Sequence, residues 1–324
     1  MGSILKKILV TGCSGLVGTK VCNQLLLDEN NLVFGIDIKL NERRLPLQNE
    51  NFVYQNIDIT DIDKINALFD LHKFDGVINA FGIKGSPIRA KESPLDFLTP
   101  SIKGNINIIE NSYKHNSFLV FLSSVGVYAP AEVFIEDTVW KTLPSEHDWF
   151  PSWSKRIPEI YLEAYKVQHN WNNFAILRPA NIFGEDDNFN EGSTVIAATI
   201  KKVANAEDNS EIIVWGDGTP TRDFIFAGEV SNSCIKVLNN KQNITCNLGS
   251  GEDISIEKMV LGVIKASGKN LKIVYDTSKP NGDKKRKMSV ERQFEYGLKN
   301  ETDFQHGLTE TYNHYYNNIK NEII

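Results

Sequence analysis

The sequence predicts an α/β protein in which a doubly wound parallel sheet carries a smaller C-terminal lobe. Three observations lead to this fold class. Short apolar runs alternate with amphipathic stretches through the first half of the chain, a glycine-rich turn follows the first apolar run, and after Arg178 the elements shorten while polar loops lengthen. Strands that alternate with helices form a parallel sheet covered on both faces, and ligands then bind at the carboxyl ends of the strands.

The first apolar run, Ile4 to Val10, predicts a strand. Three glycines follow it, and the apolar positions after them repeat with the period of a helix. A turn of this kind exposes backbone N–H groups at a helix N-terminus, where they can bind a pyrophosphate. Gly12 permits the tight turn, Gly15 lets the backbone approach the phosphates, and Gly18 lets the helix pack closely against the strand.

The second apolar run, Leu32 to Ile36, ends in an acidic residue, Asp37. An acid at this place in a dinucleotide site can accept hydrogen bonds from the adenosine ribose. It favours NAD over NADP as the cofactor, while Lys39, Arg43 and Arg44 lie close enough to leave NADP open.

The alternation of strands and helices continues up to residue 178. Strands are predicted at residues 52–57, 77–78, 118–122 and 174–177, and helices at residues 62–71, 95–113 and 154–171. This pattern places a cofactor-binding, Rossmann-type domain at residues 1–178. Residues 179–324 are expected to form a mainly substrate-binding lobe that is partly interleaved with that domain.

The composition is ordinary for a soluble protein, with 41% hydrophobic and 23% charged residues among 324. The net charge of −6 argues against a general nucleic-acid binder. No apolar run reaches the roughly 18 residues of a membrane helix, and residues 1–10 lack the apolar core of a signal peptide. The four cysteines have no metal-ligand spacing and are expected to be reduced thiols: Cys13, Cys22, Cys234 and Cys246. We therefore expect a cytoplasmic protein without a bound metal and without a membrane or nucleic-acid partner.

Six motifs follow one another in the order of a known family. They read TGCSGLVG at 11–18, DITD at 58–61, VINAFGIK at 77–84, FLSSVGVY at 121–128, RPANIFG at 178–184 and VWGDGTPTRDFI at 214–225. By these motifs the chain resembles the extended short-chain dehydrogenase/reductases, the group of sugar-nucleotide epimerases, dehydratases and reductases. The resemblance covers nearly the whole length.

The resemblance implies one site for NAD and one for a nucleoside-diphosphate sugar. The residues that it assigns to the cofactor are Gly12, Ser14, Gly15, Leu16, Val17, Asp37, Asp58, Ile59, Ala80, Lys84 and Lys155. Those that it assigns to the substrate are Ser124, Asn181, Arg222 and Arg286. Both arginines would bind the diphosphate, and Ser124 would polarise a sugar hydroxyl or carbonyl. The simpler alternatives are a strand-end serine at 124, a turn residue at 181 and a solvent-exposed charge at 286.

The expected catalytic helix departs from the family pattern at its most important position. The family's YxxxK pair combines a tyrosine that moves the hydroxyl proton with a lysine that lowers the pKa of that tyrosine. Ser154, Lys155 and Glu159 are in register with this motif, but Pro151 stands at the tyrosine position. A proton-relaying asparagine of the preceding helix is likewise replaced by Ser101.

Four side chains are candidates to replace the missing tyrosine: Tyr128, His147, Asp148 and Tyr161. For each of them a packing or surface role is the simpler interpretation, and the sequence alone favours none. Two hypotheses follow. The chain is an NAD-dependent oxidoreductase or epimerase that transfers hydride at a ring carbon, C4, of a nucleoside-diphosphate sugar. Alternatively, it is a catalytically weak or inactive protein that binds NAD and nucleotide sugars on the same scaffold.

The resemblance also implies a homodimer formed by the helices near residues 101–115 and 154–170. Apolar stripes on these helices consist of Ile102, Ile106, Ile109 and Tyr113 on the first and Ile157, Ile160, Tyr161 and Ala164 on the second. Such stripes more often pack internally, so internal packing is the alternative.

Overall fold

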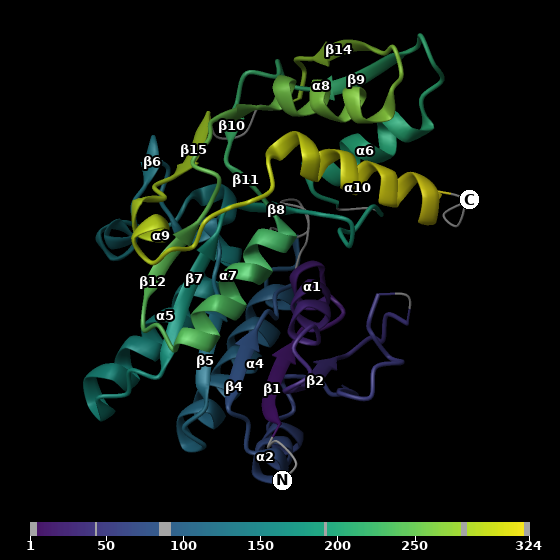
Figure 1. The fold of residues 1–324 in the computed structure, drawn as a ribbon. Coiled ribbons are helices and arrows are strands. Elements are labelled where there is room, and N and C mark those ends of the chain that lie inside the picture. The colour runs from purple at the N-terminus through teal and green to yellow at the C-terminus, as the bar shows by residue number, and fades with distance from the viewer. Residues whose placement is uncertain (1–4, 43, 84–91, 191–192, 280–283, 321–324) are drawn as a thin grey trace.

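A parallel seven-stranded sheet forms the centre of the computed structural model, which describes residues 5–42, 44–83, 92–190, 193–279 and 284–320 (Figure 1). Its strand order is β12-β7-β5-β4-β1-β2-β3, and every pairing is parallel. The strands are β1 (Lys6–Thr11), β2 (Asn31–Asp37), β3 (Phe52–Asn56), β4 (Gly76–Asn79), β5 (Phe118–Leu122), β7 (Phe174–Pro179) and β12 (Thr245–Leu248). The chain order reverses between β1 and β4, which is where ligands bind in such sheets.

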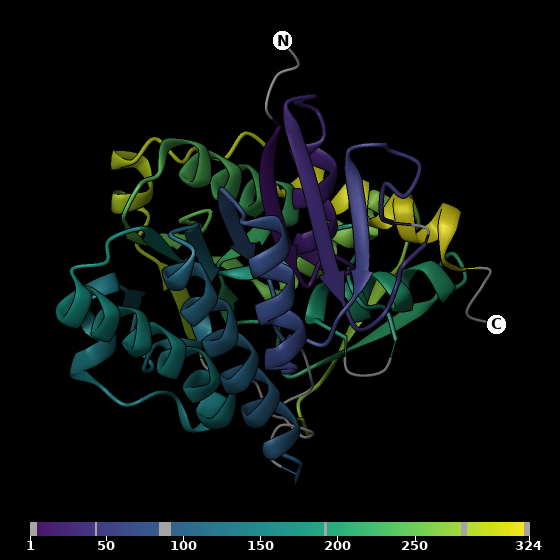
Figure 2. The same ribbon diagram turned by 90° about the horizontal axis from the view of Figure 1, so that it is seen from below.

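Helices cover both faces of this sheet (Figures 1 and 2). One face carries α1 (Leu16–Leu25) and α7 (Ala227–Asn240), and the other carries α2 (Ile62–His72), α4 (Leu95–Lys114) and α5 (Trp149–His169). The strands supply alternate residues to the two cores: Ile8 and Val10 of β1 belong to the core beneath α1, and Leu9 to the opposite one. The predicted doubly wound α/β sheet is thereby confirmed.

A second lobe with its own core lies at the top of Figure 1. Its helices are α6 (Val195–Asn205), α8 (Ile256–Ser267) and α10 (Phe304–Asn318). Its strands pair as β8 (Asn181–Phe183) with β11 (Phe224–Phe226), as β9 (Glu211–Trp215) with β14 (Lys272–Asp276), and in the order β13 (Ile254–Ser255), β10 (Thr221–Arg222), β15 (Lys285–Met288), β6 (Val133–Phe134). Short helices complete the chain: η1 (Val125–Val127), η2 (Glu136–Lys141), η3 (Glu146–Asp148) and α9 (Glu291–Glu295). None of the helices in the described ranges combines the length and apolarity needed to cross a membrane.

The chain passes between the two lobes more than once. After residue 178, α7 and β12 return to the large sheet, and before it β6 leaves to pair with β15 of the second lobe. The described part of the chain that follows β7 therefore still supplies one strand, β12, and one covering helix, α7, of the sheet.

The helix that carries Lys155 begins earlier than the sequence predicted. The prediction started this helix near Ser154, whereas α5 starts at Trp149 and ends at His169. Pro151 is its third residue, and the first four N–H groups of a helix have no intrahelical partner, so the proline removes no hydrogen bond there. The first predicted strand is also shifted, because β1 runs from Lys6 to Thr11 and Ile4 lies outside the described residues.

A buried ion pair joins this helix to the sheet. Arg178 of β7 donates from Nε to Oε1 of Glu159 at 3.0 Å and from Nη2 to Oε2 at 2.6 Å. The two side chains are 2% and 0% exposed. The remaining nitrogen, Nη1, donates to the Tyr128 hydroxyl at 3.1 Å and to the main-chain carbonyl of Glu136 at 2.9 Å. The guanidinium therefore has partners on every side, as a buried charge requires.

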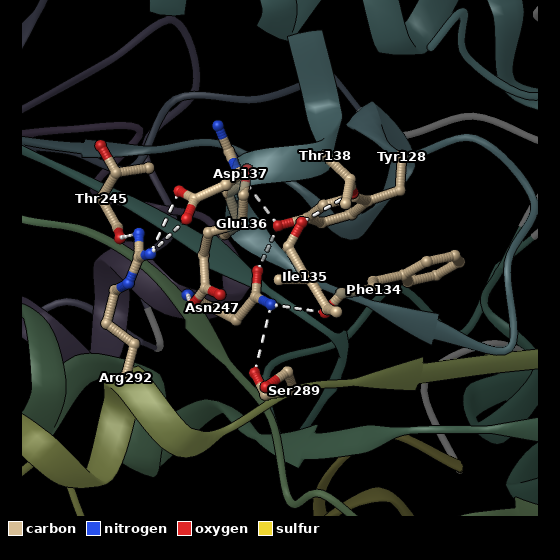
Figure 3. A network of polar contacts seen from close by, with 11 residues as sticks. Tyr128, Phe134, Ile135, Glu136, Asp137, Thr138, Thr245, Asn247, Ser289 and Arg292 are labelled. Carbon is tan, nitrogen blue, oxygen red and sulfur yellow. Dashed lines mark hydrogen bonds and ion pairs between the residues drawn. The ribbon is translucent and has the colours of Figure 1, made fainter. Parts of the chain in front are cut away.

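A polar network continues from this pair to the second lobe (Figure 3). The Tyr128 hydroxyl donates to Oδ1 of Asn247 at 2.5 Å. Nδ2 of Asn247 donates to the carbonyls of Phe134 at 2.9 Å and Ser289 at 3.2 Å, and its main-chain N–H donates to the Glu136 carboxylate at 2.9 Å. The sheet and the second lobe thus share one buried set of hydrogen bonds.

Removing the negative charge from this pair should destabilise the fold. In Glu159→Gln the Arg178 guanidinium stays buried without a counter-charge, and we expect the free energy of unfolding to fall by about 3–5 kcal/mol in urea titrations. The control is Glu211→Gln, which breaks a 2.7 Å ion pair with Lys272 whose side chains are 57% and 74% exposed. That change should cost less than about 1 kcal/mol. Equal losses in the two variants would contradict the assignment of the buried pair.

Candidate active site

A cleft of about 860 Å³ opens at the carboxyl ends of the central strands. Its walls are residues 14–17 after β1, 80–83 after β4, 122–126 at the end of β5 and 179–183 at the end of β7. The first turns of α5 and residues of the second lobe complete the lining. The cleft lies where the strand order reverses, as the sequence predicted for the ligand site.

Most of the predicted site residues meet in this cleft. Those in its lining are Ser14, Gly15, Leu16, Val17, Ala80, Ser124, Lys155, Asn181 and Arg286. Those outside its lining are Gly12, Asp37, Asp58, Ile59 and Arg222. Lys84 lies outside the described residues.

The glycine turn has the geometry that a pyrophosphate site needs. Gly12 adopts φ +66°, and its N–H donates to the carbonyl of Ile36 at 3.0 Å. A Cβ on Gly18 would lie 2.1 Å from the carbonyl oxygen of Gly12, so only glycine lets α1 pack this closely. Gly15 caps α1 without a side chain, and residues 14–17 line the cleft. The free N-terminus of α1 therefore faces the cleft and fits a dinucleotide phosphate.

The acid at the end of β2 lies against this turn. Oδ2 of Asp37 accepts a hydrogen bond from the N–H of Ser14 at 3.1 Å, and the Ser14 hydroxyl donates to the Lys39 carbonyl at 2.7 Å. Farther along, Arg44 reaches across the cleft: its Nε lies 3.4 Å from Oδ1 of Asp186, and its Nη1 donates to the Asp186 carbonyl at 2.6 Å. Both members of this ion pair line the cleft, and their contact was not predicted from the sequence.

The predicted adenine-contacting segment forms a turn beside α4. Oδ1 of Asp58 accepts hydrogen bonds from the N–H and the hydroxyl of Thr60, both at 2.8 Å. Ile59 is 4% exposed, and a Cβ on Gly104 of α4 would lie 2.5 Å from its Cγ2. In the described structure Ile59 therefore packs against α4. The Asp58 side chain stabilises the turn through its two hydrogen bonds with Thr60.

Lys155 connects α5 with the ends of two strands. Its Nζ donates to the carbonyl of Phe81 at 2.9 Å and to that of Leu122 at 2.8 Å, and it lies 5.1 Å from the centre of the Phe121 ring. Burial lowers the pKa of this ammonium to about 8, and the carboxylate of Glu159 acts in the opposite direction. The ammonium is thus fixed as a hydrogen-bond donor where β4 and β5 end.

Two serines close β5 at the cleft. The Ser124 oxygen accepts a hydrogen bond from the N–H of Gly126 at 3.1 Å, which leaves the hydroxyl hydrogen available to a ligand. The hydroxyl of Ser123 is buried and has no hydrogen-bond partner among the described residues. The sequence singled out Ser124, and in the structure both serines line the cleft.

The position of the missing tyrosine is part of the cleft wall. Pro151 lines the cleft, and its carbonyl accepts a hydrogen bond from the Ser154 hydroxyl at 2.6 Å. Ser101, which replaces the family asparagine, is 3% exposed and also lines the cleft. No tyrosine, histidine or cysteine belongs to the lining within the described ranges.

The hydroxyls of both candidate tyrosines are hydrogen-bonded outside the cleft. The Tyr128 hydroxyl donates to Asn247 (Figure 3) and accepts from Arg178. The Tyr128 side chain is 3% exposed, and burial raises its pKa. The Tyr161 hydroxyl donates to Oε1 of Glu110 at 2.7 Å, between α5 and α4, and this hydrogen bond raises its pKa. Neither residue lines the cleft, so neither replaces the missing tyrosine.

Asp148 is different, because it lines the cleft and faces a predicted substrate residue. Its Oδ2 lies 2.6 Å from Nη2 of Arg286, and the two side chains are 25% and 16% exposed. The side chain of His147, the fourth candidate, is outside the described atoms.

The predicted phosphate-binding residues are organised around Asp223. Arg222 of β10 and Arg286 of β15 are register partners, and the N–H of Asp223 donates to the Arg286 carbonyl at 2.8 Å. The Asp223 carbonyl accepts from Nδ2 of Asn181 at 2.9 Å. Its carboxylate accepts from the N–H of Ser250 at 2.8 Å, and burial raises its pKa to about 6. The main chain of this buried residue therefore joins the strand of Arg286 to the Asn181 side chain.

The four cysteines are free and buried, and burial raises the pKa of Cys13 to about 12. Cys13 packs on Gly35, where an added Cβ would lie 2.9 Å from its Sγ, so it fills space in the glycine turn. Across the described residues, no three His, Cys, Asp or Glu side chains gather as a metal site.

A family model decides the class of the protein. The model of the NAD dependent epimerase/dehydratase family matches residues 8–249. The chain belongs to this family. The resemblance to the extended short-chain dehydrogenase/reductases is therefore confirmed, and so is the prediction of an enzyme, as an NAD(P)-dependent sugar-nucleotide epimerase or reductase.

Individual relatives span almost the whole chain. It is 28% identical over 323 residues to a GDP-L-fucose synthase of Sinorhizobium fredii, with 97% of this chain and 96% of that one covered. It is 27% identical over 324 residues to a putative GDP-L-fucose synthase 2 of Arabidopsis thaliana, with coverages of 97% and 92%.

Solved structures share the fold. The UDP-glucose 4-epimerase of Thermotoga maritima with UDP-glucose superimposes with a TM-score of 0.83 at 21% identity, covering 95% of this chain and 98% of that one. The UDP-glucose 4-epimerase of Thermus thermophilus with NAD gives 0.82 at 20% identity, covering 97% and 100%. A GDP-D-glycero-L-gluco-heptose synthase of Campylobacter jejuni with NADPH gives 0.79 at 20% identity, covering 96% and 98%.

The lowered pKa of Lys155 predicts a pH-dependent stability. Between pH 8 and pH 10.5, its ordinary value, the unfolded chain keeps the proton that the folded protein has lost, so stability rises with pH. The free energy of unfolding, taken relative to Lys155→Met, should rise by up to about 3 kcal/mol across this window and stay constant below it. Urea unfolding of both proteins over a pH series measures the difference. A flat difference would show that the lysine has an ordinary pKa.

Proposed function

We propose that the protein is an NAD-dependent oxidoreductase or epimerase that transfers hydride at C4 of a nucleoside-diphosphate sugar, with an active site that lacks the usual tyrosine. One observation carries the proposal. Ser124 and Lys155 line the same cleft as the free N-terminus of α1 and the side chains of Asn181 and Arg286. At about 860 Å³ the cleft is at the upper end of the roughly 300–1,000 Å³ of ligand sites.

In this proposal, one group of cleft residues binds the cofactor and another group binds the substrate. The glycine turn and α1 bind the pyrophosphate, and Lys155 directs its ammonium toward the nicotinamide ribose. Bound NAD supplies the hydride acceptor and donor. Ser124 donates a hydrogen bond to the oxygen on the reacting carbon, while Asn181 and Arg286, with its neighbour Arg222, hold the diphosphate. In this proposal the sheet with α7 and β12 is the cofactor domain, and the second lobe supplies the substrate contacts.

NAD is the proposed cofactor, in preference to NADP. The Asp37 carboxylate lies beside the glycine turn, where a ribose hydroxyl would bind and a 2′-phosphate would be repelled. The nearest described arginine, Arg44, is paired with Asp186. Among the solved relatives one holds NAD and another NADPH, so the proposal rests on these side chains.

A protein that binds NAD and a nucleotide sugar with little turnover is the second candidate. Pro151 in the cleft wall favours it, because a missing general base typically lowers a rate by about 10²–10⁴-fold. The retained Lys155 and Ser124 favour the enzyme, because a binding protein has no need of a buried ammonium beside the reacting carbon.

Turnover measurements separate these two candidates. Nucleotide carried by the purified protein is identified by mass spectrometry, and absorbance at 340 nm is then followed with a panel of GDP- and UDP-sugars. We expect hydride transfer with at least one sugar and none in Lys155→Met, which controls for contaminating enzymes. Tight NAD binding without hydride exchange across the panel would leave the binding protein as the function.

We also propose a cytoplasmic homodimer that uses the α4 and α5 face. Tyr113 and Tyr161 pack between these two helices within one chain, as the alternative for the stripes foresaw. Ile160, Ala164 and Val167 instead form an exposed stripe on α5, which a second copy would cover. Sedimentation at micromolar concentration should give a dimer, and Ile160→Glu should give a monomer. A wild-type monomer would remove this proposal.

A further inference from the structure

The proposed reaction needs a proton acceptor, and the cleft contains few groups that can serve. Its described lining has six titratable side chains: Arg44, Asp148, Lys155, Asp186, Asp187 and Arg286. Arginines stay protonated, and below about pH 8 Lys155 is an ammonium that donates to two carbonyls, so these cations do not take a proton from a sugar hydroxyl there. Three carboxylates remain.

Two of these carboxylates serve the loop after β8. Asp187 is 2% exposed, and its oxygens accept from the N–H of Asn188 and the hydroxyl of Thr194, both at 2.8 Å. It therefore shapes the approach to α6. Asp186 pairs with Arg44, on the connection between β2 and β3, at the cofactor end of the cleft. Neither is placed at the ends of β4 and β5, where Lys155 is fixed.

Asp148 is on the helix that should carry the tyrosine. It is the residue before α5, three positions before Pro151 and seven before Lys155. Because an α-helix has 3.6 residues per turn, positions 148, 151 and 155 share one face, and all three line the cleft. At 1.5 Å per residue, Asp148 lies about 10 Å from Lys155 along the axis and less than one turn from the tyrosine position.

The partner of Asp148 links this carboxylate to substrate binding. Oδ2 lies 2.6 Å from Nη2 of Arg286, the cleft-lining arginine of the proposed diphosphate site. A diphosphate is a stronger bidentate partner for a guanidinium than one carboxylate oxygen. Substrate that binds Arg286 therefore competes with Asp148 and releases its carboxylate toward the sugar.

We propose, on the basis of the proposed function, that Asp148 replaces the missing tyrosine as the proton acceptor of the sugar hydroxyl. In the oxidative direction the O–H bond of the alcohol breaks and its proton goes to the Asp148 carboxylate, which becomes a carboxylic acid. The C–H bond of the same carbon breaks, and its hydride with both electrons goes to NAD⁺, which is reduced to NADH. The alcohol is thereby oxidised to a ketone, and in the reverse direction the acid returns the proton.

The test begins with the wild-type protein and the nucleotide sugar that it turns over. Asp148→Asn keeps the shape and removes the acceptor, and Asp148→Glu keeps the carboxylate. Asp148→Ala opens space for an added carboxylate, with formate as the probe. The side chain of Asp148 makes no capping hydrogen bond to α5, so these changes leave the helix start intact. Glu146→Gln is the matched control, because Glu146 is an exposed carboxylate two residues before Asp148 that does not line the cleft.

We expect Asp148→Asn to lower kcat by about 10²–10⁴-fold, while KM stays unchanged or falls because Arg286 loses a competitor. Formate should restore part of the Asp148→Ala rate in proportion to its concentration, which a purely structural role would not allow. Asp148→Glu should retain more activity than Asp148→Asn, and Glu146→Gln should stay near the wild-type rate.

Three results would overturn the inference: a kcat in Asp148→Asn within about threefold of the wild type, no formate rescue, or a loss in Glu146→Gln as large as that in Asp148→Asn. If the wild-type protein transfers hydride to no sugar nucleotide, the proposed function itself fails, and this is known before any variant is compared.

Discussion

The bidentate ion pair between Arg178 and Glu159 holds together the two elements that bring most of the reactive side chains to the cleft. Glu159 is one turn beyond Lys155 on α5, and Arg178 is three residues before Asn181, where β7 ends. A charge pair without water tolerates little displacement, since a lost partner leaves an uncompensated charge in a medium of low polarity. The ion pair therefore fixes the position of α5 along the sheet. It thereby also fixes the position of the Lys155 ammonium relative to the ends of the strands.

The same ion pair determines the role of Tyr128, the tyrosine that follows β5 and its serines most closely in the sequence. Its hydroxyl completes the hydrogen bonding of Arg178 and passes the network on to Asn247 and the second lobe. Asp223 has the corresponding role on the other side of the cleft, where its main-chain N–H donates to the Arg286 carbonyl and its main-chain carbonyl accepts from the Asn181 side chain. The residues proposed to bind substrate and cofactor are thus connected to buried polar groups outside the cleft, so the lining itself can change without loss of the frame.

The parts of the fold that depend on local sequence were predictable, and those that depend on distant partners were not. The glycine turn could be predicted from Gly12, Gly15 and Gly18, because the spacing of these glycines is visible within one short stretch of sequence. The roles of Tyr128 and Tyr161 depend on partners 119 and 51 residues away, which no local pattern reveals. The contact between Asp148 and Arg286 joins the short helix η3 before α5 to a strand of the second lobe, so the sequence could name both residues without pairing them.

Pro151 leaves the backbone of α5 intact but removes the hydroxyl that the family pattern places there. At the third position of α5 a proline removes a donor that has no intrahelical acceptor, so the helix and everything that it carries stay in place. The phenol is lost, but the carboxylate on the same face, and the ammonium that it would have worked with, remain. Lys155 could not be exchanged so freely, because it bonds the ends of β4 and β5. The dinucleotide site is built from glycine geometry and main-chain groups of the sheet, whereas the proton acceptor needs one side chain at a helix start. These two requirements are therefore physically separable, and this chain keeps the first while moving the second by less than one turn.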